Sequence, residues 1–287
     1  MSAWRRSPRR KSADGHEPRD LRGRICFGNN AMPEVEVTAR VRVHALTHHG
    51  AVRPHNEDTV AVGEWMASND LTRSKVFTFE EEGPVVAVVA DGLGGHAAGD
   101  VASRAAAGYL AARAGGLTTT AKAISLLQDC NGVLYDMMVR GEGAPGMGTT
   151  VVGLVVRGDG AIAFNVGDSR AYRFDGSELV QLSTDDTPGP KLENGRTAAM
   201  TTPLITQSLG GQSSFTEIHP HAESDSAVPG TRYLLCSDGL SDLVGADAIA
   251  ARLRENEDAE AVHALFKDAM GLGGKDNISI VIVRVED

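Results

Sequence analysis

Alternating apolar and polar positions predict strands along much of this chain. Over residues 35–45 every second residue is apolar, the pattern of a long strand with one buried face. Residues 84–90 form a continuous apolar run, which is typical of a strand buried on both faces. Shorter patterns of these kinds predict strands at residues 58–62, 149–156, 161–166, 169–174, 179–182, 215–221, 232–237 and 278–285.

Four segments have the composition or spacing of helices: residues 99–114, 119–139, 246–254 and 258–270. The order is strands, two helices, many strands, helices and a closing strand. Such segregated runs favour an α+β fold with mainly antiparallel sheets over an alternating βαβ fold. Gly-containing turns at residues 157–160 and 175–176 predict that the strands between residues 149 and 182 form a meander of hairpins.

The pattern also predicts how the chain is divided. Residues 1–33 are rich in Arg, Pro, Gly and Ser and have no periodicity, so we expect a disordered basic extension. Residues 34–287 are expected to form one domain, with a polar, flexible flap at about residues 186–210.

Composition narrows the class of protein. With 41% hydrophobic and 23% charged residues, the chain is typical of a soluble globular protein, and its net charge of −10 disfavours a broad nucleic-acid-binding surface. Cys26, Cys130 and Cys236 are too widely spaced for a disulfide framework or a zinc cluster, which suits a reducing compartment. Neither a membrane-spanning run of about 20 apolar residues nor a secretory signal is recognisable. We therefore expect a cytoplasmic protein.

Acidic residues stand at the ends of the predicted core strands. Asp91 and Asp238 each follow an apolar strand and precede a glycine, Asp276 precedes the closing strand, and Glu57 and Asp58 precede another strand. Gathered carboxylates repel one another unless a cation neutralises them, and oxygen ligands favour Mg²⁺ or Mn²⁺. An Asp-Gly pair is also typical of an ordinary turn. The residues alone leave both interpretations open.

Six motifs in a fixed order decide between these interpretations. Among them are Met147-Gly-Thr-Thr150 and the segment that begins Asp91-Gly-Leu-Gly-Gly95. The complete set is residues 47–58, 91–103, 147–150, 167–172, 236–242 and 274–277. The set resembles the motifs of bacterial metal-dependent type 2C (PPM) serine/threonine protein phosphatases. The resemblance implies a central β-sandwich of two mainly antiparallel sheets flanked by α-helices (αββα), with a two-metal site at one end.

The resemblance also implies roles for individual residues. Asp91 is expected to bridge two Mn²⁺ or Mg²⁺ ions, with the carbonyl of Gly92 binding one of them, and Asp238 and Asp276 binding the other. Glu57 and Asp58 are expected to act on metal-bound waters or at the edge of the coordination shell, and Arg53 to bind the phosphate. A water that bridges the ions would attack phosphoserine or phosphothreonine directly, without a covalent enzyme intermediate.

A third ion is left open by the sequence. Asp168, Asp185 and Asp242 match positions at which family members hold additional ions, but a structural turn explains Asp168 equally well. Gly143 stands where many bacterial relatives have an acidic residue. Leu93 stands where some eukaryotic relatives have a proton-donating histidine, so the donor to the leaving group is undetermined.

We therefore expect a phosphatase that opposes serine/threonine kinases in bacterial signalling. Its partners would be phosphorylated proteins, among them a kinase and its substrates, and it would act as a monomer without nucleic acid. The alternatives are a catalytically silent phosphoprotein-binding pseudophosphatase and a phosphatase of small metabolites that uses the same centre. A third alternative is that the basic residues 1–33 anchor the chain to nucleic acid or to a membrane.

Overall fold

In the computed structural model the chain divides into two units, Met1–Glu36 and Val37–Asp287. The structure describes residues 40–80, 83–93, 98–188 and 204–286, all of them in the second unit. The predicted extension at residues 1–33, the first residues of the strand predicted at 35–45 and residues 189–203 of the predicted flap lie outside the described residues.

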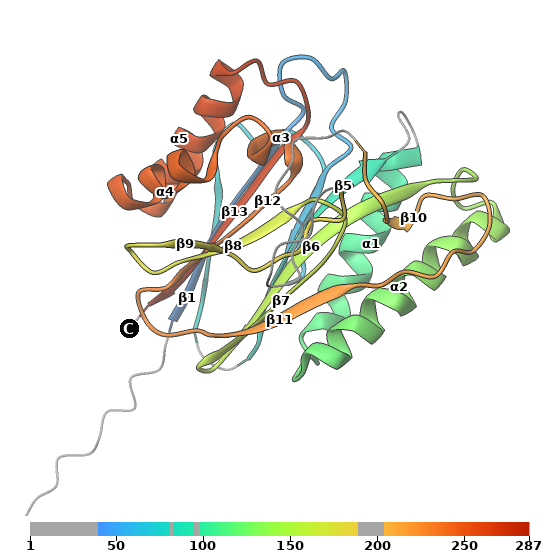
Figure 1. The fold of residues 1–287 in the computed structure, drawn as a ribbon, viewed down its shortest axis with the longest axis horizontal. Helices are drawn as coiled ribbons and strands as arrows, with labels where there is room; N and C mark the ends of the chain where they lie inside the picture. The colour runs from blue at the N-terminus through green and yellow to red at the C-terminus, as the bar shows by residue number, and fades with distance from the viewer. Residues whose placement is uncertain (1–39, 81–82, 94–97, 189–203, 287) are drawn as a thin grey trace, which may run out of the picture. The chain divides into compact units, whose positions relative to one another are not determined.

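Two antiparallel sheets form the centre of the second unit (Figure 1). In the described residues the first sheet has the order β4 (Lys75–Phe79), β1 (Arg40–His48), β13 (Ile278–Glu286), β12 (Arg232–Cys236), β8 (Arg170–Phe174) and β9 (Leu179–Gln181). The second has the order β11 (His221–Ser226), β7 (Gly160–Val166), β6 (Gly148–Arg157), β5 (Val85–Leu93), β2 (Thr59–Val62) and β3 (Trp65–Ala67), and β10 (Leu209–Gly210) pairs with β6.

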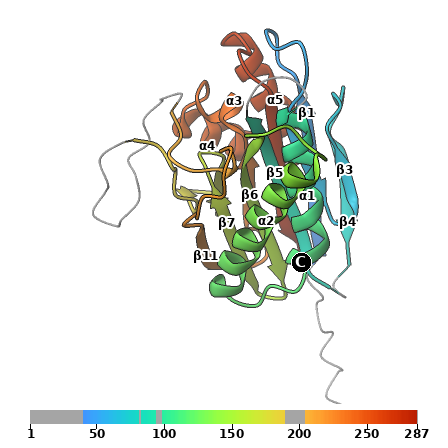
Figure 2. The same cartoon turned by 90° about the vertical axis from the view of Figure 1, so that its right-hand side faces the viewer.

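Helices cover the outer face of each sheet. The second sheet carries α1 (Gly99–Ala114) and α2 (Thr120–Arg140), which lie side by side in front of β5, β6 and β7 in Figure 2. The first sheet carries α3 (Asp238–Ser241), α4 (Ala246–Glu255) and α5 (Asp258–Gly271). The predicted α+β sandwich with helices on both sides is confirmed. None of the helices in the described ranges has both the length and the apolar character that crossing a bilayer requires.

Three buried apolar clusters hold these layers together, one between the sheets and one under each set of helices. Strand β13 contributes to two of them, because its side chains alternate between faces. Val281 and Val283 point between the sheets, whereas Ile280 and Ile282 point toward α5. Burial on both faces therefore explains why Ile280–Val283 of this strand are all apolar.

The helices and most strands lie where the sequence predicts them, and α1 has the predicted bounds. The strand predicted at residues 215–221 is wrong. Strand β11 begins only at His221 and is polar, because in the described part of the chain it is an edge strand whose one partner is β7. The side chain of Phe215 instead packs edge-on against Tyr135 of α2, at 5.2 Å between ring centroids.

The predicted meander is also wrong in part. The pairs β6–β7 and β8–β9 are hairpins, but they belong to different sheets. The chain crosses from the second sheet to the first between Val166 and Arg170. This crossing places Asp168 at the end of the sandwich, between the two sheets.

Gly153 of β6 makes room for the ring of Phe164, its partner on β7, which is fully buried. A Cβ on Gly153 would fall on that ring. We expect Gly153→Ala to lower the free energy of unfolding by about 1–3 kcal/mol, as overpacking does. Urea unfolding measures this change.

Gly132 provides the matched control, because a Cβ there has nothing within 4 Å and the residue lies inside α2. Gly132→Ala should raise the free energy of unfolding by about 0.5–1 kcal/mol, since alanine favours the helix. Equal stability of Gly153→Ala and the wild type would contradict the packing argument.

Candidate metal centre

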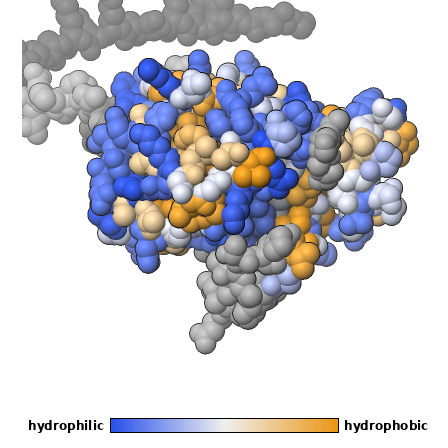
Figure 3. Space-filling view, turned by 90° about the horizontal axis from the view of Figure 1, so that it is seen from above, coloured by the Kyte–Doolittle hydropathy of each residue, from blue (hydrophilic) through white to orange (hydrophobic). Residues whose placement is uncertain are grey.

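Four buried or half-buried aspartates meet at one end of the sandwich, and both sheets contribute to them. Asp91 lies near the end of β5 and Asp58 just before β2 in the second sheet. Asp238 begins α3 directly after β12, and Asp276 precedes β13, both in the first sheet. This end of the molecule faces the viewer in Figure 3, where hydrophilic and hydrophobic residues are interspersed. The structure therefore brings together the acids that the sequence predicts.

Burial and mutual repulsion raise the pKa values of three of these carboxyl groups, those of Asp58, Asp91 and Asp238. Burial is the main cause for Asp91, whose pKa is raised well above the usual range, with further contributions from Asp58, Asp238 and Asp276. Burial together with neighbouring aspartates raises the pKa of Asp58 to about 7, and that of Asp238 also to about 7. Such shifts mean that the protein alone does not compensate for the gathered negative charge.

Asp58 joins the two sheets through hydrogen bonds. Its Oδ2 accepts the hydroxyl groups of Ser237, at 2.8 Å, and Ser279, at 2.6 Å. These serines lie at the end of β12 and in β13, so the hydrogen bonds link the start of β2 to the first sheet. The other oxygen, Oδ1, is buried and has no partner among the described residues.

Asp91 and Asp238 lie close enough together for each to shift the pKa of the other. Oδ1 of Asp238 is buried and, like Oδ1 of Asp58, unpartnered within the described ranges. The pair Asp91-Gly92 is typical of a turn, but β5 continues through Leu93 and pairs with β6 up to Gly148. The sheet therefore holds the backbone of Asp91.

The glycines after these two aspartates are required by close approach of neighbouring backbone. A Cβ on Gly92 would fall on the carbonyl group of Gly99 and come within 2.8 Å of the carbonyl oxygen of Glu57. A Cβ on Gly239 would fall on the carbonyl group of Asn277. The two glycines thus let the elements that carry the acids pack together.

Asn277 positions the loop that precedes β2, a role that the sequence reasoning missed. Its Oδ1 accepts the backbone N–H of Glu57 at 2.8 Å, and its Nδ2 donates to the carbonyl groups of His49, at 3.1 Å, and His55, at 2.9 Å. Among side chains, only an amide offers two N–H donors together with an acceptor, which these three hydrogen bonds use. The sequence could have indicated this role, because Asn277 follows Asp276 in the last motif.

Arg53 lies on the same loop, at the exposed mouth of the site. Its Nη2 donates to Oδ2 of Asp276 at 2.7 Å, and half of its side chain is exposed. This hydrogen bond and the nearby charges of Asp91 and Glu57 raise the pKa of the guanidinium further. Arg53 is therefore a permanent cation beside the carboxylates.

The outer acids fall into two groups. Burial, followed by the charges of Asp242 and Asp185, raises the pKa of Asp168 to about 6, and burial raises that of Asp242. Both of these acids also raise the pKa of Asp238, so they lie next to the inner site.

Asp185 is held differently, in a buried ion pair. Its carboxylate accepts from Nε and Nη2 of Arg170, at 2.9 and 2.7 Å, and from Nε2 of Gln181 at 2.7 Å. The carboxylate is fully buried and its charge is already matched by the guanidinium. The geometry therefore gives Asp185 a structural role beside the outer acids.

The inner residues fit divalent cations. The donors are carboxylate and carbonyl oxygens, the ligands that hard ions such as Mg²⁺ and Mn²⁺ prefer. The two unpartnered buried oxygens, on Asp58 and Asp238, are polar groups that a cation would satisfy. A divalent ion would also remove the repulsion that raises the pKa values.

Comparison with known proteins agrees with this geometry. Residues 68–276 match the family model of protein phosphatase 2C. The chain belongs to the protein phosphatase 2C family.

Several relatives of this protein phosphatase 2C are bacterial proteins. It is 34% identical over 261 residues to the serine/threonine protein phosphatase PstP of Mycobacterium tuberculosis, covering 88% of this chain but only 46% of that protein. This chain thus spans about half the length of that relative. It is 30% identical over 256 residues to the serine/threonine phosphatase stp of Listeria monocytogenes, covering 83% of this chain and 93% of that one.

A solved structure of the PstP catalytic domain in complex with two manganese ions has the same fold. The TM-score is 0.68 at 32% identity, and the match covers 87% of this chain and all of that one.

The repulsion among the acids predicts how this protein phosphatase 2C domain responds to pH without metal. The folded-state pKa of Asp238 lies at about 7, above its ordinary value of 3.8. Its contribution to stability is therefore fully present below pH 3.8 and is lost as the pH rises through about 7. In a chelator, Asp238→Asn should be more stable than the wild type, and the difference in free energy of unfolding should grow over this pH range.

Urea unfolding at pH 5 and pH 8 measures the difference, and Mn²⁺ supplies the complementary test. A cation present at 100 times its dissociation constant stabilises the folded state by about 2.7 kcal/mol. Mn²⁺ should therefore stabilise the wild type more than Asp238→Asn. If neither Mn²⁺ nor chelator changes the free energy of unfolding of the wild type, a metal centre at this end of the sandwich is refuted.

The buried ion pair of Asp185 predicts a loss of stability that metal does not alter. Asp185→Asn leaves the Arg170 guanidinium buried without a carboxylate, which costs about 3–5 kcal/mol. The loss should be the same in chelator and in Mn²⁺, as measured by urea unfolding. Asp159→Asn, in the exposed β6–β7 turn, is the control and should be neutral. A loss that appears only in Mn²⁺ would instead make Asp185 a metal ligand.

Proposed function

We propose that this protein is a metal-dependent phosphoprotein phosphatase that hydrolyses phosphoserine and phosphothreonine. The observation that carries the proposal is the set of buried aspartates with unpartnered oxygens beside the exposed cation of Arg53. A dianionic phosphate monoester needs cationic partners, and this site offers a guanidinium and ligands for metal ions. The names of the bacterial relatives, which are serine/threonine phosphatases, support the same activity.

The metal ligands in this proposal are Asp91, the carbonyl of Gly92, Asp238 and Asp276, holding two Mn²⁺ or Mg²⁺ ions. The two manganese ions of the PstP catalytic domain support this number. When bound, such ions lower the pKa of water toward neutrality and stabilise negative charge on phosphoryl oxygens. Asp168 and Asp242 are the candidates for a further ion, and the ion pair with Arg170 leaves Asp185 out of the set.

In this proposal Arg53, Asp58 and Glu57 bind the phosphate, position the loop before β2 and act on water. Arg53 is kept in place by Asp276 through one N–H group, and its remaining N–H groups have no partner among the described residues. They form a planar fork that matches two phosphate oxygens. Asp58, fixed by two serine hydroxyl groups, fixes the start of β2 behind the metal ligands. Glu57, half-buried at the mouth, would accept a proton from water at its carboxylate.

We further propose that the enzyme acts in the bacterial cytoplasm, as a monomer, on proteins phosphorylated by a serine/threonine kinase. The site draws its acids from one chain, which supports a monomer. Cys130 and Cys236 are buried and free, which suits a reducing compartment.

The test is phosphate release from p-nitrophenyl phosphate and from a phosphothreonine peptide. We expect turnover with Mn²⁺ or Mg²⁺ and none in chelator. Arg53→Ala should lower kcat/KM on the order of 100-fold, because a donor to the transition-state charge is lost. Mn²⁺ should still raise the stability of this variant, since the aspartates are intact.

Arg140→Ala is the matched control, because Arg140 lies on an exposed surface, where Glu142 is its one ion-pair partner among the described residues, at 2.9 Å. It should turn over both substrates like the wild type. Turnover in chelator, or full activity of Arg53→Ala, would contradict the proposed mechanism.

A further inference from the structure

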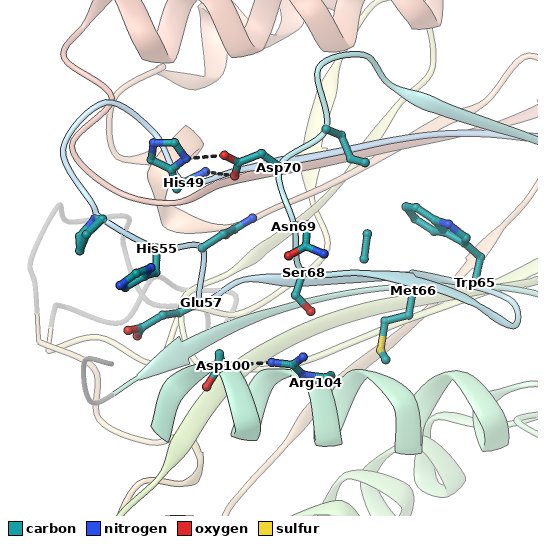
Figure 4. Close-up of a pocket in the computed structure, with 14 residues that line it drawn as sticks. His49, His55, Glu57, Trp65, Met66, Ser68, Asn69, Asp70, Asp100 and Arg104 are labelled. Atoms are coloured by element: carbon teal, nitrogen blue, oxygen red, sulfur yellow. Dashed lines mark hydrogen bonds and ion pairs between the residues drawn. The ribbon is translucent and has the colours of Figure 1, made fainter. Parts of the chain in front are cut away.

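A groove with a volume of about 960 Å³ opens beside the candidate metal centre (Figure 4). This volume is at the upper end of the range of about 300–1,000 Å³ for ligand pockets. Its walls come from three elements: the loop between β1 and β2, the segment that starts in β3, and the first turns of α1. The residues that matter below are His49, Glu57, Met66, Asp70, Asp100 and Arg104.

The groove is continuous with the candidate metal centre. Glu57 belongs to both, and Pro54 and His55, which directly follow Arg53, line the groove. In Figure 4 the side chain of Glu57 lies at one end and that of Trp65 at the other. A phosphoryl group bound at Arg53 would therefore place the adjoining part of its carrier in this groove.

Negative charge dominates the lining. Three carboxylates, those of Glu57, Asp70 and Asp100, line the groove, whereas its lining residues include one guanidinium, that of Arg104. Arg104 is already paired with Oδ2 of Asp100 at 2.7 Å, and Oδ1 of Asp100 has no partner among the described residues. Asp70 accepts two hydrogen bonds from His49, one from the backbone N–H at 2.8 Å and one at the ring Nδ1. Charge complementarity thus favours a cationic side chain in the groove.

The far end of the groove is apolar. Trp65 and Met66 line it there, and 40% of the Met66 surface is exposed, which is high for a large apolar residue. The same two residues line a second hollow of about 520 Å³ along α1, where Gly108 and Ala112 leave room. Together the hollows offer an extended path that leads away from Glu57, suited to several residues of a peptide chain.

We propose that this groove binds the substrate segment next to the phosphorylated residue and selects a basic side chain there, followed by an apolar side chain over Trp65 and Met66. The proposal rests on the proposed phosphatase function, which supplies the anchored phosphoresidue. It adds a substrate class: phosphoproteins with a basic residue close to the phosphorylation site.

The test compares phosphothreonine peptides of equal length that carry Lys or Glu on one side of the phosphothreonine, with a second pair for the other side. Each kcat/KM is divided by that of p-nitrophenyl phosphate, which is too small to fill the groove. We expect the wild type to favour a Lys peptide on at least one side. The preference should shrink as salt is added, because exposed charges are screened.

Two variants one turn apart on α1 should shift the preference in opposite directions. Asp100→Asn removes a carboxylate and should reduce the preference by about 1.5-fold to fivefold, the range for exposed ion pairs. Arg104→Ala frees Asp100 and should increase the preference. A general folding defect cannot produce opposite signs. Asp129→Asn, exposed on α2, is the matched control and should leave the preference unchanged.

Met66→Glu tests the apolar end. It should lower the normalised kcat/KM of a Lys peptide that continues with Leu relative to one that continues with Ser. Equal ratios in Met66→Glu and the wild type would refute that half of the proposal.

The outcomes separate this proposal from the proposed function. Hydrolysis of p-nitrophenyl phosphate with equal use of Lys and Glu peptides would overturn the groove while leaving the phosphatase intact, as would equal effects of Asp100→Asn and Asp129→Asn. If the wild type hydrolyses no substrate, the proposed function fails. Fluorescence anisotropy with labelled peptides and Mn²⁺ then decides the groove, which requires tighter binding of the Lys peptide.

Discussion

Repulsion among buried carboxylates is the constraint around which this end of the molecule is built. Asp58 and Asp91 come from one sheet, Asp238 and Asp276 from the other, and packing of the two sheets forces them together. The free energy that holds them there comes from the three apolar clusters, since the acids themselves oppose the fold. Asp58, Asp91, Asp238 and Asp276 would cease to repel one another if they held a divalent cation, and binding of that cation would then stabilise the fold.

The partners of each acid decide whether it remains available to a cation. Asp58 is held by serine hydroxyl groups, which orient the carboxylate but leave its charge in place. Asp185 is held by Arg170, which cancels that charge. Asn277 orients the loop of Arg53 and Glu57 in the same neutral way as the serines. Acids held by neutral donors thus keep the negative charge that a metal ion needs, whereas Asp185, held by the cation of Arg170, has a structural role.

The hydrophobic pattern along the chain was sufficient to predict the helices and strands that are buried uniformly along their length. The apolar run of β13 and the Ala-rich α1 could be predicted because each is buried in a way that its own sequence records. The pattern did not predict strand β11, because an edge strand can be polar. It did not predict the crossover between β7 and β8 either, because a short Gly-containing link has the same sequence character whether it closes a hairpin or connects two sheets. The pairing of Asp185 with Arg170 is a tertiary contact between residues 15 apart, which no motif records.

The sign of the charge at the mouth links the metal centre to the groove. Without cations, one exposed guanidinium faces at least four carboxylates, a field that repels a phosphate dianion. Under the proposed function, affinity for phosphate would depend on occupied metal sites, because bound divalent ions would be the largest local charges and would reverse that field. Two further carboxylates of the groove, Asp70 and Asp100, do not belong to the candidate metal centre. A substrate with a phosphate at the metal centre and a basic side chain in the groove would meet opposite charge in both places. An acidic side chain beside the phosphorylated residue would be repelled by the carboxylates of the groove.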